Sequence, residues 1–253
     1  MIKKFMKKYL GYFLFTLFFS FFPLNQGLAL NKQEIKEIRQ EIKKFSTKLE
    51  ELKVSDVFTC DSKNNPKGDF DIYMKGIKER TYYNDRAYEI SDLVEKWGKE
   101  LRNHYKETII NDVVVDLSET TAYWFHNGEL INKTRIEWLV NKTKVAVGDE
   151  KISKGTKIGT CVIGKKVPYP KSHWNSNSRS ITILYGHPYN SYGARKLELW
   201  KDGKYTRYSM HGTNDESSIG KHISMGCVRF YNSDILIFYE LVKEKETIVR
   251  TIE

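Results

Sequence analysis

Two residues in the last fifth of the chain have types and neighbours suited to nucleophilic chemistry. His211 opens the stretch HGTNDESSIGKHISMGCVRF, and Cys227 follows it sixteen residues later. Small residues lie beside both, namely Gly212, Ser224 and Gly226. A thiol attacks only as its thiolate, so it needs a neighbouring base or cation. The stretch therefore predicts a cysteine nucleophile with a histidine base.

The small residues also suggest backbone roles. Amides around Cys227 can point at a developing oxyanion, and Ser224 and Gly226 leave room for a substrate. The Gly212 carbonyl has no side chain in its way and is suited to holding the His211 ring in one tautomer.

Two other interpretations fit the same residues. Cysteine is among the residue types most often buried, so a single Cys and a single His are frequently packing residues. With His222 between them, His211 and Cys227 also offer three ligands of the kind that bind zinc. Residue types alone leave a nucleophile, a packing pair and a metal site open.

The chain from Asn111 onward predicts the strands that would position this pair. It reads as a compact β-rich domain with one late helix, and HNG at residues 126–128 predicts a hairpin turn. His211 ends an expected strand, KYTRYSM, and Cys227 begins another, CVRFYN, so the two could face each other at a rim. Other strands are expected at KIGTCVIG, SITILY, RKLELW and ETIVRTIE.

Three helices are also expected. Apolar residues at steps of three and four predict amphipathic helices over residues 31–53 and 85–105. A late helix is expected over residues 233–243, capped by Asn232 or Ser233. The segment 30–110 is therefore helical and separate in kind from residues 111–253.

Residues 1–29 have the three parts of a secretory signal. Four lysines without an acid precede an apolar run from Tyr9 to Leu24, and small residues permit cleavage after Ala29. The run has sixteen residues, fewer than the roughly 20 that span a bilayer, and retention as an anchor over residues 9–24 is the alternative. In either case the protein is expected outside the cytoplasm, in the periplasm or cell envelope.

Charge and cysteine count fit such a location. The net charge is +10, and removal of the four lysines leaves +6, which favours anionic partners such as wall polymers or lipid head groups. Export makes nucleic acid the poorest candidate. Three cysteines are an odd number for an exported chain, so Cys60 and Cys161 either form a disulfide or remain thiols, and Cys227 is left over.

Five segments, taken together, resemble one known family. They are HGTN (211–214), SMGCVR (224–229), NSYGARKLEL (190–199), VVVDLSETTAYWFHNGELI (113–131) and FYNSDILIFYELV (230–242). In this order they are similar to the catalytic signature, opening hairpin and closing helix of the L,D-transpeptidase (YkuD-type) family. The resemblance covers about residues 111–253 and implies a mixed β-sandwich or barrel with one late helix, preceded here by a helical region.

The resemblance also implies roles for individual residues. Cys227 would be the nucleophile, His211 the general base, and the Gly212 carbonyl the group that orients the base. The oxyanion hole would be the amides of Met225, Gly226 and Cys227; substrate contacts would come from Arg229, Ser224 and Asn214.

One position departs from the family pattern. Met225 stands where the family usually has a second histidine, which puts substrate positioning and rate in question. His222, three residues earlier, is interpreted as a loop histidine rather than its replacement. No metal and no cofactor are implied.

The implied reaction is acyl transfer on peptidoglycan tetrapeptide stems through a cysteine thioester, giving 3→3 cross-links, exchange or anchoring to an envelope protein or other amine acceptor. Two alternatives stay open: an L,D-carboxypeptidase of the same fold, and an inactive wall-binding module. A papain-like endopeptidase is disfavoured, because there the cysteine precedes the histidine.

Overall fold

The computed structural model describes residues 30–60, 84–106, 108–131, 134–149, 155–176 and 179–253, and the expected export signal lies outside these ranges. The helices are α2 (Lys32–Glu51), α3 (Val54–Phe58), α5 (Asp85–Tyr105) and α6 (Asn232–Leu241), with a 3-10 turn, η4, at Glu216–Ser218. The strands are β1 (Asp112–Asp116), β2 (Thr121–Ile131), β3 (Thr134–Gly148), β4 (Gly159–Val167), β5 (Ser172–Ser176), β6 (Arg179–Ile183), β7 (Lys196–Lys201), β8 (Lys204–His211), β9 (His222–Ser224), β10 (Val228–Phe230) and β11 (Ile248–Ile252). Within these ranges, no helix has the length and apolar character needed to cross a bilayer.

The large sheet closes on itself. Its strand order is β10-β8-β7-β4-β11-β1-β2-β3-β9, and β10 also pairs with β3. This extra pairing joins β10 through β3 into a barrel and leaves β9 attached outside it. The sheet is mixed, since β1–β11, β8–β10 and β3–β9 are parallel pairs and the others are antiparallel. The expected mixed, β-rich fold with a late helix is therefore confirmed.

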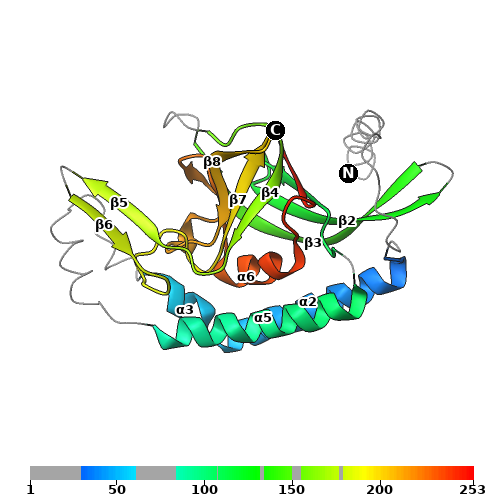
Figure 1. Ribbon diagram of the computed structural model, residues 1–253, viewed down its shortest axis with the longest axis horizontal. Coiled ribbons are helices and arrows are strands. Elements are labelled where there is room, and N and C mark those ends of the chain that lie inside the picture. Colours follow the sequence, from blue (N-terminus) through cyan, green and yellow to red (C-terminus); the bar gives the residue numbers. More distant parts are fainter. Residues whose placement is uncertain (1–29, 61–83, 107, 132–133, 150–154, 177–178) are drawn as a thin grey trace.

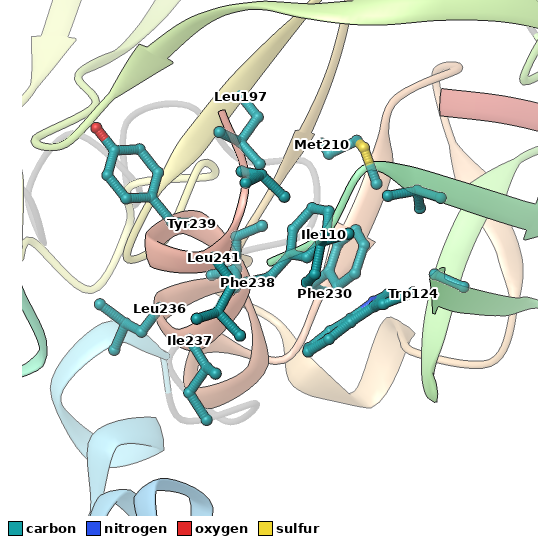
Figure 2. Packing of buried hydrophobic residues seen from close by; sticks show 14 of the residues in the cluster. Ile110, Trp124, Leu197, Met210, Phe230, Leu236, Ile237, Phe238, Tyr239 and Leu241 are labelled. Atoms are coloured by element: carbon teal, nitrogen blue, oxygen red, sulfur yellow. The ribbon is translucent and has the colours of Figure 1, made fainter. Parts of the chain in front are cut away.

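Helix α6 lies between the barrel and the amino-terminal helices (Figure 1). All of residues 235–241 are buried, as expected for a helix that is apolar on every side. On the barrel side, the Phe238 ring stacks on Phe230 with 5.5 Å between ring centres and lies 4.9 Å from Trp124 (Figure 2). These contacts among three aromatic rings hold α6 against the inner face of the barrel.

Helices α2 and α5 lie on the other side of α6 (Figure 1). Asn31 caps α2, because its side chain accepts from the amides of Gln33 and Glu34. One hydrophobic cluster includes residues of α2, α5, α6 and the barrel. The face of α2 predicted from periodicity is the buried one: Ile35, Ile38, Ile42, Phe45 and Leu49.

The predicted hairpin turn at residues 126–128 is wrong. These residues lie inside β2, where the register with β3 shifts, so the sequence HNG forms an irregularity in a paired strand and not a turn. His126 is 2% exposed and accepts the Leu30 amide at Nε2, 3.2 Å away, while Nδ1 lies 3.0 Å from the Ile109 carbonyl. The histidine thus anchors the strand in place.

The predicted cap of α6 is also wrong. The N-cap residue is Tyr231, which makes no side-chain cap bond. Asn232 is the first residue of the helix, and its side chain makes hydrogen bonds to backbone groups of Ala194 and Thr213.

Candidate active site

Strands β7, β8 and β10 bring the predicted base and nucleophile to one face of the barrel. The parallel register aligns Arg229 with His211, so Cys227, immediately before β10, lies beside Ser209. Ser209 Oγ is 3.9 Å from Cys227 Sγ. Met210, between Ser209 and His211, is fully buried in the core. Because side chains alternate along a strand, the opposite face carries Ser209, His211, Cys227 and Arg229.

His211 is held as a neutral ring with one free nitrogen. Its Nδ1 lies 2.6 Å from the Gly212 carbonyl, which can only accept, so Nδ1 carries the hydrogen and Nε2 keeps its lone pair. Burial, reinforced by the Arg229 and Lys196 cations and opposed by the Gly212 bond, lowers the pKa of His211 to about 3. The ring is therefore neutral at pH 7, with the lone pair of Nε2 available, which is the state that a general base requires.

The segment from Ser224 to Cys227 is folded around the Ser224 hydroxyl. That hydroxyl donates to the Cys227 carbonyl and accepts from the Gly226 amide at 3.2 Å. Gly226 has a φ of 104°, which favours glycine, and its carbonyl accepts from Thr156 Oγ1 at 3.1 Å. Met225 is 73% exposed. Of the three amides expected in the oxyanion hole, that of Gly226 is thus engaged inside the loop, and Ser224 serves as its brace.

Arg229 is the register partner of His211 on β10, and Asn214 follows the histidine by three residues. Arg229 is half-buried, and this burial lowers the pKa of its guanidinium, while Asp215 and Cys227 act in the opposite direction. The Asn214 carbonyl accepts from the Cys60 amide at 3.0 Å. Arg229 therefore adds positive charge to the site. The hydrogen bond at Asn214 connects the loop after β8 to the residues that follow α3.

Asn232 positions the loop after β8, a role that the sequence analysis missed. The side chain is fully buried. Its Oδ1 accepts from the amides of Ala194 at 2.9 Å and Thr213 at 3.3 Å, and its Nδ2 donates to the Thr213 carbonyl at 2.7 Å. A Cβ atom added at Gly193 or Gly212 would lie 2.2 or 2.3 Å from Asn232 Oδ1. In the sequence, the glycines of NSYGA and HGTN were the available signal for this close packing.

Lys196 is a second residue of the site that the sequence analysis missed. Its register partner is His211. The ammonium lies 3.5 Å from Glu198 Oε1 and 4.7 and 5.5 Å from the ring centres of Tyr192 and Tyr205. The Tyr192 ring meets the His211 ring edge-on, with 5.0 Å between centres. The Lys196 cation and the Tyr192 ring therefore lie beside the histidine, and the alternating polar residues of RKLELW were the signal for Lys196.

The alternative arrangements of the cysteines are not formed. In the part of the chain that the structure describes, no three His, Cys, Asp or Glu side chains gather as metal ligands, and His222 is exposed on β9. Cys60 and Cys161, both in described segments, are not joined by a disulfide. Cys60 Sγ donates to the Pro188 carbonyl at 2.8 Å, and burial raises the pKa of Cys161 on β4.

The closed mixed barrel places His211 at the end of β8 and Cys227 immediately before the adjacent strand β10. Residues 110–250 match the L,D-transpeptidase catalytic domain, YkuD. The chain belongs to the L,D-transpeptidase family.

Individual relatives match over shorter segments. The YkuD protein of Bacillus licheniformis is 32% identical over 116 residues, which are 46% of this chain and 56% of that protein. The YqjB protein of Bacillus subtilis is 36% identical over 69 residues, 27% of this chain and 39% of that protein. The chain thus spans about half or less of the length of these relatives.

Solved structures of the same class are also similar to the chain. An L,D-transpeptidase from Mycobacterium smegmatis has a TM-score of 0.41 at 15% identity, over 56% of this chain and 58% of that one. An L,D-transpeptidase from Stackebrandtia nassauensis has a TM-score of 0.36 at 23% identity, over 56% of this chain and 55% of that one.

Proposed function

We propose that the protein is a peptidoglycan L,D-transpeptidase that works through a thioester on Cys227. The observation that carries the proposal is the strand register that sets Cys227 beside Ser209 and diagonal to a neutral His211. Membership of the family supports the substrate class, peptidoglycan peptides. The net charge of +10 suits an anionic wall.

The first half of the reaction forms the acyl-enzyme. His211 Nε2 accepts the thiol proton of Cys227, and the sulfur attacks the carbonyl carbon at the L-centre of the stem's diamino acid. The oxyanion is stabilised by the amides of Met225 and Cys227, because the Gly226 amide is bonded to Ser224. The C–N bond then breaks, the imidazolium returns its proton to the departing amine, and D-alanine leaves.

The second half transfers the acyl group to an amine. The acceptor amine attacks the thioester carbonyl, loses a proton to His211, and the C–S bond breaks to return the thiol of Cys227. An amine of a second stem gives a 3→3 cross-link, a D-amino acid gives exchange, and a lysine of an envelope protein gives anchoring. Water in place of the amine gives the L,D-carboxypeptidase alternative.

We propose that the protein acts outside the cytoplasm, on the composition of its amino-terminal segment. Residues 1–29 have the composition of an export signal, which supports a location in the periplasm or cell envelope. The same residues are the part of the chain to test, by fusing them to a reporter that is active only outside the cytoplasm.

Incubation with purified tetrapeptide muropeptides tests the reaction. Mass analysis should show a covalent adduct of stem minus D-alanine on Cys227, and products whose masses identify the acceptor. Cys227→Ala should form no adduct, while the matched Cys161→Ser variant should form it as the wild type does. Absence of both adduct and product in the wild type, with every stem offered, would refute the enzyme.

A further inference from the structure

The hydroxyl of Ser209 is the side-chain group beside the Cys227 sulfur, at 3.9 Å. Ser209 is 1% exposed, so its hydroxyl must satisfy its hydrogen bonds within the protein. The same oxygen also lies 3.3 Å from the Tyr205 hydroxyl. Neither contact belongs to the chemistry described above for the cysteine and the histidine.

A bulge in β8 makes the contact between Tyr205 and Ser209. The register with β7 shifts here, and Arg207 has a φ of 70°, which is costly for a long side chain. The Thr206 hydroxyl braces the bulge by donating to a β7 carbonyl at 2.6 Å and accepting from the Tyr208 amide at 3.2 Å. Cα atoms four residues apart in an unbroken strand are about 13 Å apart, farther than tyrosine and serine side chains reach together. The bulge therefore re-aims the tyrosine toward the site.

The donors and acceptors give this series of groups a direction. The Lys196 ammonium lies 5.5 Å from the centre of the Tyr205 ring, and a cation beside a phenol strengthens its hydroxyl as a hydrogen-bond donor. The Tyr205 hydrogen is then available to the Ser209 oxygen, and the Ser209 hydrogen is left for the Cys227 sulfur. Hydrogen bonds in such a series polarise and strengthen one another.

We propose that Ser209 is a positioning residue that stabilises the Cys227 thiolate by donating its hydroxyl hydrogen to the sulfur, with Tyr205 and Lys196 setting the direction of that bond. The inference rests on the proposed function, because it concerns the nucleophile of that reaction. A hydrogen bond to the charged form of a group favours that form. The thiol proton still goes to His211 Nε2, and Ser209 keeps its own.

The surroundings of His211 explain why the sulfur needs this donor. Its ring is buried between the Arg229 and Lys196 cations, so an imidazolium formed beside the thiolate is itself destabilised. A donor that stabilises the thiolate directly offsets part of this cost. The other titratable groups around the sulfur stay unchanged in the test below: Tyr192 before β7, Lys196 and Glu198 on β7, His211 on β8, and Arg229 on β10.

Alkylation of the full chain by iodoacetamide, followed at the Cys227 peptide by mass spectrometry as a function of pH, tests the proposal. In Ser209→Ala the midpoint of the rate profile should rise by about one pH unit, the size expected for one hydrogen bond to an ion. The plateau rate at alkaline pH should stay within about threefold, because the sulfur itself is unaltered. Tyr205→Phe should shift the midpoint in the same direction by about half as much. The matched control, Tyr208→Phe on the same strand, should leave it in place.

Two outcomes would overturn the proposal. One is an unchanged midpoint in a folded Ser209→Ala variant, whether or not the plateau falls as a packing role predicts; the other is a midpoint that Tyr205→Phe leaves where the wild type has it. If Ser209→Ala does not fold, Tyr205→Phe decides alone, since Tyr205 is 38% exposed and its ring is kept. Iodoacetamide needs no peptidoglycan, so a wild type inactive on muropeptides would refute the proposed function and leave this result standing.

Discussion

Replacing Asn232 with alanine should destabilise the protein strongly, because one buried amide satisfies three buried backbone groups. These are the Ala194 N–H, the Thr213 N–H and the Thr213 carbonyl. Each buried polar group left without a partner costs about 1–3 kcal/mol, so the three together cost at least about 3 kcal/mol. In a chain of this size 1 kcal/mol corresponds to about 2–4 °C, and the melting temperature should fall by about 6–12 °C.

The same change should lower the rate of the reaction at temperatures well below melting. Asn232 holds the loop whose Gly212 carbonyl orients His211, so its loss allows the base to leave the productive geometry. Scanning calorimetry and thioester formation with a tetrapeptide stem measure the two effects. Asn103→Ala, an exposed asparagine of α5, is the matched control and should shift melting by less than about 2 °C. An Asn232→Ala variant that behaves like this control in both assays would refute the reasoning.

Four further predictions concern pH, the departure from the family pattern, thiol reactivity and metal. The pKa of His211 is about 3 in the folded protein and about 6.5 unfolded, so between these values the folded state binds fewer protons and the free energy of unfolding should fall on acidification, by about 3 kcal/mol at about pH 4. Urea unfolding at several pH values should show this slope in the wild type and a reduced one in His211→Gln; parallel slopes would contradict it. Met225 is 73% exposed, so Met225→His and Met225→Ala should keep turnover within about tenfold; a thioester in Met225→His but not in the wild type would instead favour the wall-binding module. Iodoacetamide with peptide mapping should label Cys227 before Cys161, whose pKa burial raises, and the reverse order would count against Cys227 as nucleophile. Turnover should survive exhaustive chelation, and zinc lost together with activity would restore the metal interpretation.

The elements predicted well are those whose signal is local. The buried face of α2 repeats at helical spacing, and the strands expected at RKLELW and KYTRYSM are β7 and β8. The HNG prediction at residues 126–128 failed because the same residues fit an irregularity inside a paired strand. Closure of the barrel by β3 and β10 joins segments far apart in sequence, and no local pattern indicates it.

The site divides in the same way. His211 and Cys227 could be found because their chemistry requires those residue types near small neighbours. Asn232, Lys196 and Ser209 had at most a weak signal, since each acts through a residue that register or a buried loop contact brings to it. In sequence they are polar residues in a helix start and in two strands, where many roles are equally common.

The amino-terminal helices contribute to this geometry through contacts with the loops of the site. The Ser55 hydroxyl of α3 donates to one carboxylate oxygen of Glu216 at 2.7 Å. The other carboxylate oxygen accepts from the backbone N–H of Asn232 at 2.9 Å. Glu216 therefore joins α3 to the residue that holds the loop after β8. The Cys60 amide adds a second link, to the Asn214 carbonyl.

Helix α5 makes an equivalent link on the side of β7. Arg195, next to Lys196, is 1% exposed and donates to Ser91 Oγ of α5 at 2.9 Å, to the Tyr185 hydroxyl at 3.0 Å and to the Pro168 carbonyl at 2.9 Å. A buried guanidinium needs several acceptors to offset its lost hydration, and one of these comes from the helical segment. Since α6 also requires an apolar cover on the side away from the barrel, the helices and the strands that carry the candidate site depend on each other for their stability.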